Sequence, residues 1–418
     1  MRSAVVVDVL RTPFGRRGGM LAAQHPADLL GRVLDALAIR NGLGPTAVGH
    51  LIENVIENVI ESVIEDVIVG CVMQIGAQSL NVGRAAVLAA GWPHTVSAAT
   101  VDRQGASGQQ ALHIAAQGVA AGAYDVAVAA GVEIMSLVPM GASVSKGLGL
   151  PFGPRVTERY RDQGGLVPLG LGAELLAERT GISREAMDHW AGRSRQRALR
   201  AQDQGWLGAD RMGFDGFQRP GRRSPRTLEV PASDRDGDRD ELVGSEPGGG
   251  EDGALLKPGW REDGRVTAGN SAPIADGAGA VLIMSEERAE QLGLRPRARF
   301  VAFATAGSDP LRALEGPVPA TEVVLARAGL RLADIDAFEV HEDFAVTVLA
   351  WLAAVGADPE LVNANGGALA FGDPVGASGL RLTGSLLGQL ERGGGRYGLQ
   401  TMAGSGGVAT AMILERLG

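Results

Sequence analysis

The stretch TVDRQGASGQQA, residues 100–111, has the composition of a chemically reactive turn. An extended, β-branched start is followed by the small residues GASG (105–108), and a helical run begins around Gln109. This pattern predicts a strand, a tight turn and a helix N-terminus. Such turns often present a nucleophile, because the free N–H groups of the new helix stabilise an anion beside it. Within the turn, only Ser107 carries a hydroxyl group.

Cysteine and histidine are too sparse to predict a disulfide or a metal site. Cys71 is the only cysteine, and it lies in the apolar run DVIVGCV (66–72), where we interpret it as a core residue. The six histidines include no HxxxH or similar ligand pair. We therefore expect no metal and a location in the reducing cytoplasm.

Size and charge narrow the class of protein. The chain has 418 residues, enough for two or three domain-sized units, and 45% of them are hydrophobic. The net charge of −9 argues against non-specific binding of nucleic acid, which needs a basic face. No apolar run approaches the roughly 20 residues that span a bilayer, and the N-terminus lacks the apolar stretch of a signal peptide. We expect no nucleic-acid or membrane partner.

Apolar β-branched runs alternate with Ala/Leu-rich helical stretches along the first part of the chain. Strands are expected at 4–9, 66–72, 125–132 and 280–285. Helices are expected at 26–42, 83–91 and 109–122. This alternation is typical of parallel strands with crossover helices. Residues 298–417 repeat the same order, so the sequence predicts a duplicated α/β unit.

The segment between the two sets of elements differs in composition. We predict a first half made of residues 1–134 and 263–290, an inserted domain at 135–262, and a second half at 291–418. Within the insert, 169–181 and 183–202 read as helices. The acidic, glycine-rich segment 229–253 reads as a solvated loop. Its DRDGDRDEL phrase resembles part of a calcium loop, but the glycine and the closing glutamate are out of register.

Residues 53–68 are a tandem repeat, ENVI ENVI ESVI EDVI. A period of four would keep Val and Ile on one slowly rotating stripe of a helix. The repeat either lengthens a helix or loop before the next strand or forms an oligomer contact. It suggests no catalytic role.

Seven phrases, in order from Ala4 to Leu417, together resemble a thiolase of the acetyl-CoA acyltransferase (3-ketoacyl-CoA thiolase) type. They are VDVLRTPFGRRGG, DVIVGCVMQIG, TVDRQGASGQQA, GNSAPIADGAGAVLIMS, EVHEDF, NANGGALAFGDPVGASGLRL and GLQTMAGSGG. The resemblance implies two βαβαβαββ halves in five layers, α-β-α-β-α, with an inserted loop domain. It also implies a coenzyme A thioester as substrate or ligand, no other cofactor, and a homodimer or homotetramer. An acyl-carrier-protein thioester, which has the same pantetheine arm, stays open.

The positions that carry chemistry in the family are changed in this chain. The family's acylated cysteine corresponds to Gly105, and the histidine of its GHP phrase corresponds to Asp373. The family's second cysteine, a base, corresponds to Ala403, and the asparagine of its NEAF phrase corresponds to His341. Losing a nucleophile from a catalytic unit costs about 10⁶ in rate. Ordinary thiolysis is therefore not expected.

The resemblance also assigns positions that bind the thioester. A glycine that helps form the family's oxyanion hole corresponds to Ser405, whose N–H remains available beside that of Gly105. A serine close to the pantetheine corresponds to Ala272. Arg222 and Arg223, in the phrase RPGRRSPR, are candidates for the 3′-phosphate of coenzyme A, or belong to a solvated charged turn.

Two functional hypotheses follow. In the first, the site has been rebuilt. The family positions of His341 and Asp373 face one pocket, so these residues would form a dyad in which the carboxylate orients the imidazole. Ser107 would complete a triad in outline, although capping of its helix is the more usual role. Asp343 would add negative charge or be satisfied by a backbone N–H.

In the second hypothesis, the chain is an inactive homologue that binds a thioester or holds a partner protein. A decaying copy is a third, weaker alternative, because the glycine framework of the family phrases is intact. A dyad requires the His341 and Asp373 side chains to lie within about 3 Å of each other and to face a pocket.

Overall fold

The computed structural model describes residues 2–43, 63–144, 149, 151–213, 239–245, 256–312 and 314–418. Its strands are β1 (Ala4–Arg11), β2 (Gly15–Arg16), β3 (Asp66–Gly70), β4 (Ser97–Val101), β5 (Val126–Ile134), β6 (Ala275–Ser285), β7 (Ala298–Gly307), β8 (Ala337–Val340), β9 (Tyr397–Gly404) and β10 (Val408–Arg416). Its helices are α1 (Pro26–Arg40), α3 (Val82–Ala89), α4 (Ser107–Ala121), α5 (Pro154–Arg159), α6 (Leu169–Thr180), α7 (Arg184–Asp203), α8 (Glu286–Gln291), α9 (Pro317–Ala328), α10 (Ala345–Val355), α11 (Ala368–Phe371) and α12 (Val375–Gly393). Among the described helices, none is long and apolar enough to cross a membrane.

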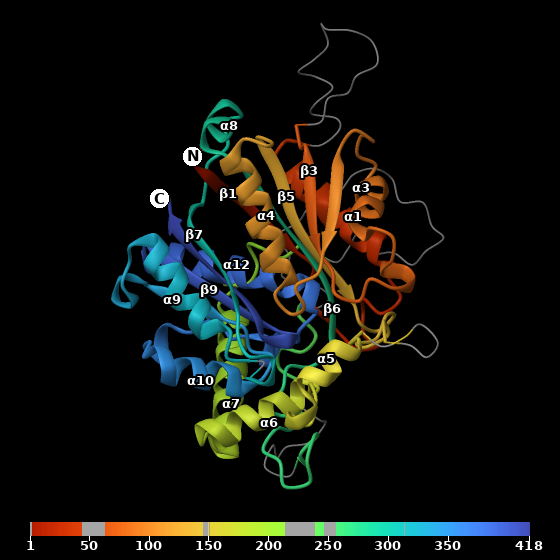
Figure 1. Ribbon diagram of the computed structural model, residues 1–418. Coiled ribbons are helices and arrows are strands. Elements are labelled where there is room, and N and C mark those ends of the chain that lie inside the picture. Colours follow the sequence, from red (N-terminus) through yellow and green to blue (C-terminus); the bar gives the residue numbers. More distant parts are fainter. Residues whose placement is uncertain are drawn as a thin grey trace, which may run out of the picture.

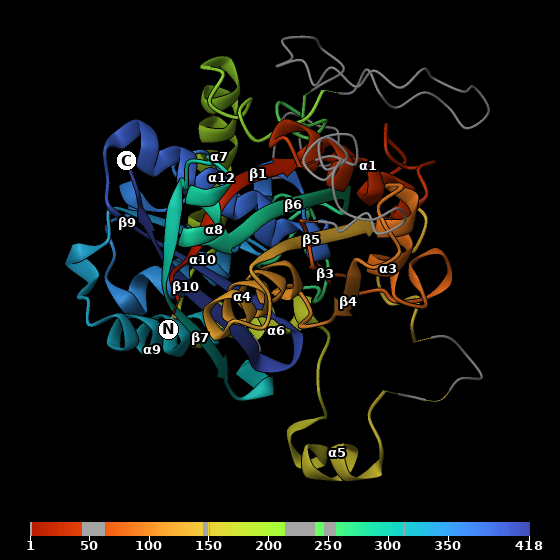
Figure 2. The same cartoon turned by 90° about the horizontal axis from the view of Figure 1, so that it is seen from above.

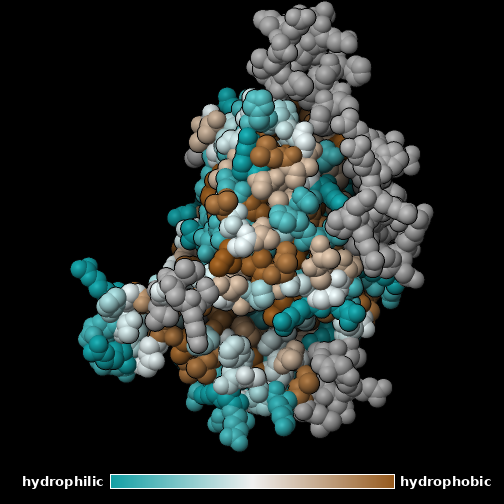
Figure 3. Space-filling view, turned by 90° about the vertical axis from the view of Figure 1, so that its right-hand side faces the viewer, coloured by the Kyte–Doolittle hydropathy of each residue, from teal (hydrophilic) through white to brown (hydrophobic). Residues whose placement is uncertain are grey.

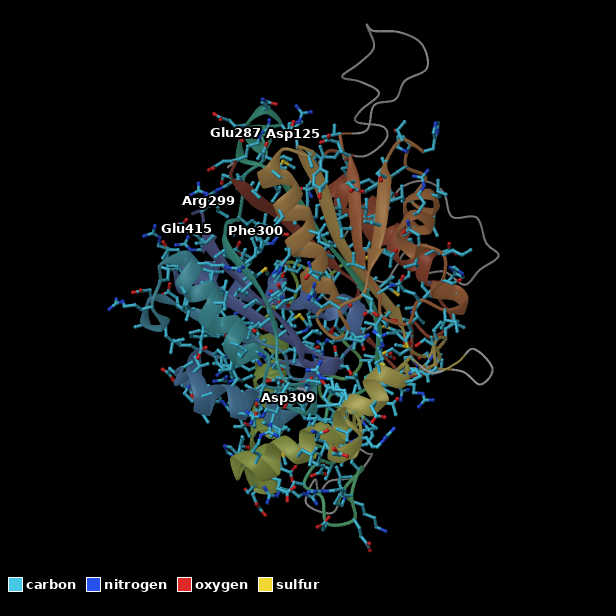
Figure 4. All side chains as sticks on the ribbon, in the orientation of Figure 1. Asp125, Glu287, Arg299, Phe300, Asp309 and Glu415 are labelled. Carbon is cyan, nitrogen blue, oxygen red and sulfur yellow. The ribbon has the colours of Figure 1, made fainter. Side chains whose placement is uncertain are left out.

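The strands form a single sheet in the order β4-β3-β5-β6-β1-β7-β10-β9-β8, with β2 paired to β6. β1 and β7 meet in its middle through the antiparallel pairs Val5–Arg299 and Val6–Ala298. Figure 4 labels Arg299 and Glu415 at this seam. Nη1 of Arg299 and Oε2 of Glu415 form an ion pair at 3.5 Å. The seam joins two halves of similar design.

Each half repeats one order outward from the seam, β1-β6-β5-β3 in the first half and β7-β10-β9-β8 in the second. β3 pairs in parallel with β5, and β8 pairs in parallel with β9. In the second half, an isolated parallel bridge between Phe338 and Val362 takes the place of the edge strand β4. The duplicated α/β unit expected from the sequence is confirmed.

Helices occupy three layers around the two halves of the sheet (Figure 1). α4 and α12 form the inner layer, between the two halves of the sheet. Leu112 of α4 and Leu386 of α12 belong to one buried apolar cluster that includes strand residues of both halves. α1 and α3 cover the outer face of the first half, and α9 and α10 cover that of the second. α6 and α7 pack against α10, whereas α5 stands apart in Figure 2. The five-layered α-β-α-β-α fold is thus confirmed.

Glycines allow the inner helices to meet near their N-termini. A Cβ on Gly108 of α4 would lie 2.7 Å from the carbonyl oxygen of Gly376 in α12, and a Cβ on Gly379 would collide with the backbone nitrogen of Gln109. Larger residues would force these helices apart. The close crossing brings together the turn before α4 and the loop before α12, where Gly105 and Asp373 lie.

One expectation changes in detail. The segment 229–253 was expected to be a solvated loop, but its described part buries Asp240, which is 1% exposed. Asp240 accepts hydrogen bonds from both Arg11 guanidinium nitrogens, at 2.6 and 2.9 Å. Such pairing offsets the cost of removing a carboxylate from water, and it ties the insert to β1.

Most of the tandem repeat lies outside the described residues, which resume at residue 63. Its last copy is extended, because β3 begins at Asp66. This agrees with the strand expected at 66–72.

Candidate functional site

The turn between β4 and α4 is held by its own hydrogen bonds. Gln104 has φ of 53°, in the left-handed region. Ser107 Oγ donates to the Gln104 carbonyl at 2.7 Å and accepts from the Arg103 N–H at 2.8 Å. α4 begins at Ser107, two residues before the expected Gln109. The Ser107 hydroxyl is therefore engaged within the turn.

His341 and Asp373 approach the turn from the second half of the molecule. His341 follows β8 directly, and its N–H donates to the Thr401 carbonyl at 3.0 Å, which extends the pairing with β9. The N–H of Asp373 donates to the carbonyl of Pro273 at 2.9 Å. His341 Nε2 then lies 3.1 Å from Asp373 Oδ2. The backbone of two separate elements thus fixes this contact.

Ser378, on the first turn of α12, also contacts the carboxylate of Asp373. Its Oγ donates to Asp373 Oδ1 at 2.5 Å, so each carboxylate oxygen of Asp373 has one side-chain partner. Ser378 was not among the site residues expected from the sequence. It lies five residues after Asp373, in the first turn of the helix that follows, and this spacing could have suggested a contact between the two side chains.

The pair carries opposite charges near neutral pH. Burial alone would lower the pKa of His341, but the charge and hydrogen bond of Asp373 outweigh it and raise this pKa to about 9. Burial alone would raise the pKa of Asp373, but His341 and the Ser378 hydroxyl outweigh it and lower this pKa. The resting state is an imidazolium bonded to a carboxylate.

Asp343 is held by the start of α10. Its Oδ1 accepts from the Phe344 N–H at 2.9 Å and from the Thr347 hydroxyl at 2.7 Å. Burial raises its pKa despite these bonds and the nearby imidazolium. Its effect on His341 is electrostatic, since its charge raises the pKa of the imidazole.

The imidazole of His341 fills the space in front of Gly105. A Cβ on Gly105 would lie 3.1 Å from His341 Cε1 and 2.8 Å from the Ala403 carbonyl oxygen. His341 Nδ1 is buried without a hydrogen-bond partner. The free nitrogen of the ring therefore lies beside the turn, where a side chain at position 105 would otherwise project.

The other residues expected at the site differ in burial and position. Ala403 is buried on β9, while Ser405 is exposed just beyond the strand. The N–H of Ala272 donates to the Asp343 carbonyl at 2.9 Å, which places it next to the His341 segment. Arg222 and Arg223 lie outside the described residues.

Cys71 sits in an environment that suppresses thiol chemistry. It is fully buried, and its Sγ lies 3.8 Å from Glu133 Oε1. Burial, and next the negative charge of Glu133, raise the pKa of the thiol. Because the thiolate is the reactive form, Cys71 is inert. In the described part of the chain, no group of three or more His, Cys, Asp or Glu residues is arranged to hold a metal ion.

The fold and site define an α/β protein built from two similar halves, and comparison with known proteins makes this specific. The family model "Thiolase, N-terminal domain" matches residues 50–212 and 230–287, and "Thiolase, C-terminal domain" matches residues 294–416. The chain therefore belongs to the thiolase family of acyl-CoA acyltransferases.

Similar proteins cover the whole chain. The steroid 3-ketoacyl-CoA thiolase FadA6 of Mycobacterium tuberculosis is 39% identical, covering 100% of this chain and 95% of its own length. A 3-ketoacyl-CoA thiolase of Klebsiella pneumoniae is 37% identical with full coverage of both chains. The crystal structure of the Bacillus anthracis acetyl-CoA acetyltransferase superposes with a TM-score of 0.80 at 33% identity, covering 100% and 99% of the two chains.

Proposed function

We propose that this protein acts on coenzyme A thioesters, or on the equivalent acyl-carrier thioesters, without an acyl-cysteine. It serves as an acyltransferase or as an enzyme that forms or cleaves a carbon–carbon bond. The observation that carries the proposal is the 3.1 Å contact of His341 with Asp373, which leaves Nδ1 free beside the turn at Gly105. The single cysteine is buried, so the imidazole is the reactive group that faces this turn.

The proposed chemistry uses the pair as an acid and base. With Nε2–H held by Asp373, deprotonation of Nδ1 yields a base that abstracts a proton from the thioester's α-carbon, from water or from an acceptor. The reprotonated imidazolium is stabilised by Asp373, and Ser378 keeps the carboxylate oriented. General-base catalysis of this kind contributes about 10²–10⁴ in rate. The N–H groups of Gly105 and Ser405 would stabilise the developing oxyanion.

A second candidate is a thioester-binding or scaffolding subunit without activity. Its supporting observation is the near-complete burial of His341, which is 1% exposed. In that role the imidazolium–carboxylate pair is a structural replacement for the lost catalytic groups. A partner protein would then supply the chemistry.

Assembly as a homodimer or homotetramer is part of the proposal. β4 is an edge strand with partly exposed residues, and edge strands are ready to pair with another chain. Leu80 is 93% exposed and Leu88 is 53% exposed on the neighbouring segment. Figure 3 views this side of the molecule and shows apolar patches on it.

The test measures the products formed from a panel of acyl-CoA thioesters, including free coenzyme A, with and without acyl acceptors. Wild type is compared with His341→Ala and Asp373→Asn. A matched control is His113→Gln, because His113 is equally buried but packs edge-on against Phe303, on another strand. Turnover that falls at least 100-fold in His341→Ala but not in His113→Gln supports the enzyme.

Calorimetric titration with the same thioesters separates the two candidates. Binding without turnover by the wild type would exclude the enzyme and favour the binding subunit. Turnover that survives His341→Ala would reject the proposed role of the pair. Absence of both turnover and binding would reject the enzyme and the thioester-binding subunit, and would leave only the scaffolding role.

A further inference from the structure

A small polar cavity lies between α12 and the segment that follows α7. Its volume is about 10 Å³, and its lining includes Arg11, Arg381, Ser385 and Arg392. This volume suits one water molecule or one ion of similar size.

Arg381 is a buried cation without a bonded carboxylate. It is 3% exposed, and its Nε has no hydrogen-bond partner. Its Nη1 donates to the neutral Ser385 hydroxyl at 3.3 Å, and its Cζ lies 4.8 Å from the centre of the Phe371 ring. Buried charges are normally paired, because desolvating them is costly.

The nearest acidic side chain on β8 does not neutralise Arg381. Glu339 is fully buried, and both of its carboxylate oxygens lack hydrogen-bond partners. Burial raises the pKa of Glu339 to about 8, in spite of the attraction of Arg381. At neutral pH the carboxyl is therefore mostly protonated. The more distant carboxylates of Glu342 and Asp240 attract Arg381, but no acidic side chain is hydrogen-bonded to it.

The other charges at the cavity leave a positive excess. Arg11 is already paired with Asp240, and Asp210 is paired with Arg297 at 3.1 Å. Arg392 donates to the amide oxygen of Asn365 at 2.9 Å and stacks over Trp206 with Cζ at 4.8 Å. Arg381 and Arg392 thus present two guanidinium groups without a carboxylate hydrogen bond.

We propose that this cavity binds one monatomic anion of chloride size between Arg381 and Arg392. The anion supplies the missing counter-charge and ties α12 to the segment that follows α7, which carries Trp206. Arg381 is one turn beyond Ser378 on α12. Because its charge helps to lower the pKa values of His341 and Asp373, the bound anion adjusts the charge balance of the pair.

The first experiment compares thermal unfolding of the full chain in sodium chloride, sodium bromide and sodium gluconate at equal ionic strength. Gluconate is too large for the cavity. We expect a Tm about 2 °C higher in either halide, at a concentration of roughly ten times Kd. The halide effect should disappear in Arg392→Met.

Arg396→Met is the matched control. Arg396 also stacks on an aromatic ring, with Cζ 4.8 Å from the centre of Tyr397, but it pairs with Glu415 away from the cavity. This variant should keep the full halide effect. Equal Tm values in halide and gluconate for the wild type would overturn the proposal, as would the same halide effect in Arg392→Met.

Anomalous diffraction from bromide-soaked crystals of the wild type tests for the anion without the use of any variant. A bromide peak between the Arg381 and Arg392 guanidinium groups supports the site. Density for a water molecule with no anomalous signal contradicts it. Neither result depends on whether the protein turns over a thioester.

Discussion

Position 105 and the imidazole of His341 occupy overlapping space. A residue larger than glycine would place its Cβ 2.8 Å from the Ala403 carbonyl oxygen and 3.1 Å from His341 Cε1. These separations are too short for relaxed packing. A cysteine at position 105, where the family resemblance places the nucleophile, would therefore compete with the His341 side chain for the same space.

Gly105→Cys is expected to restore no thiolysis of a 3-ketoacyl-CoA and to lower the free energy of unfolding by about 1–3 kcal/mol through overpacking. The resemblance implies that a nucleophile there needs a histidine and a second cysteine at positions 373 and 403, where this chain has Asp373 and Ala403. Thiolysis assays and denaturant unfolding check both effects. Gly153→Cys is the control, since a Cβ there meets nothing within 4 Å. Thiolysis by Gly105→Cys alone would refute this expectation.

The His341–Asp373 pair should make stability depend on pH. The folded pKa of His341, about 9, lies above its ordinary value of 6.5. The pair therefore contributes stability that is fully present below about pH 6.5 and is lost as pH rises through about 9. Denaturant unfolding at pH 6 and pH 9 should show a loss in wild type that is much smaller in Asp373→Asn. Equal losses in both proteins would show that other groups cause it.

Turnover should have the opposite pH dependence if Nδ1 acts as the base. The deprotonated imidazole increases as pH approaches 9, so the rate should rise up to that pH and then level off. A rate that is highest at pH 6 and falls towards pH 9 would instead identify the imidazolium as an acid.

At the scale of elements, the crossing of α4 and α12 sets the site. Gly379→Ala would push its Cβ into the backbone of α4, so we expect a loss of about 1–3 kcal/mol together with lower turnover. Gly393→Ala, in the same helix, meets nothing within 4 Å and should change stability by no more than about 0.5 kcal/mol. Full activity and stability in Gly379→Ala would mean that the helices need not approach so closely.

At the scale of the whole molecule, the buried Arg11–Asp240 pair fastens the segment around Asp240 to β1. Asp240→Asn leaves Arg11 without its carboxylate, and we expect it to cost about 3–5 kcal/mol. Glu158→Gln, which removes the exposed pair with Arg161, should cost about 0–1 kcal/mol. Chemical denaturation compares the two variants. Similar small effects would show that the insert is held mainly by apolar packing.

The two-half architecture was predictable because β-branched runs and Ala/Leu-rich stretches alternate in both parts of the chain. The site was predictable only in part. The family phrases suggested that His341 and Asp373 are neighbours, but no spacing in the sequence revealed that the imidazole fills the space before Gly105. The burial of Asp240 was missed because its acidic, glycine-rich surroundings favour a solvated loop. Ser378 and Arg381 were missed because their partners depend on the tertiary packing of α12.

The most direct test of the central claim is thioester turnover by Cys71→Ala, a chain that contains no thiol at all. We expect turnover within about twofold of wild type, because Cys71 is buried against Glu133 and the pKa of its thiol is raised. A loss approaching the roughly 10⁶-fold cost of removing a nucleophile, in a variant that remains folded, would contradict the account and restore cysteine to the mechanism.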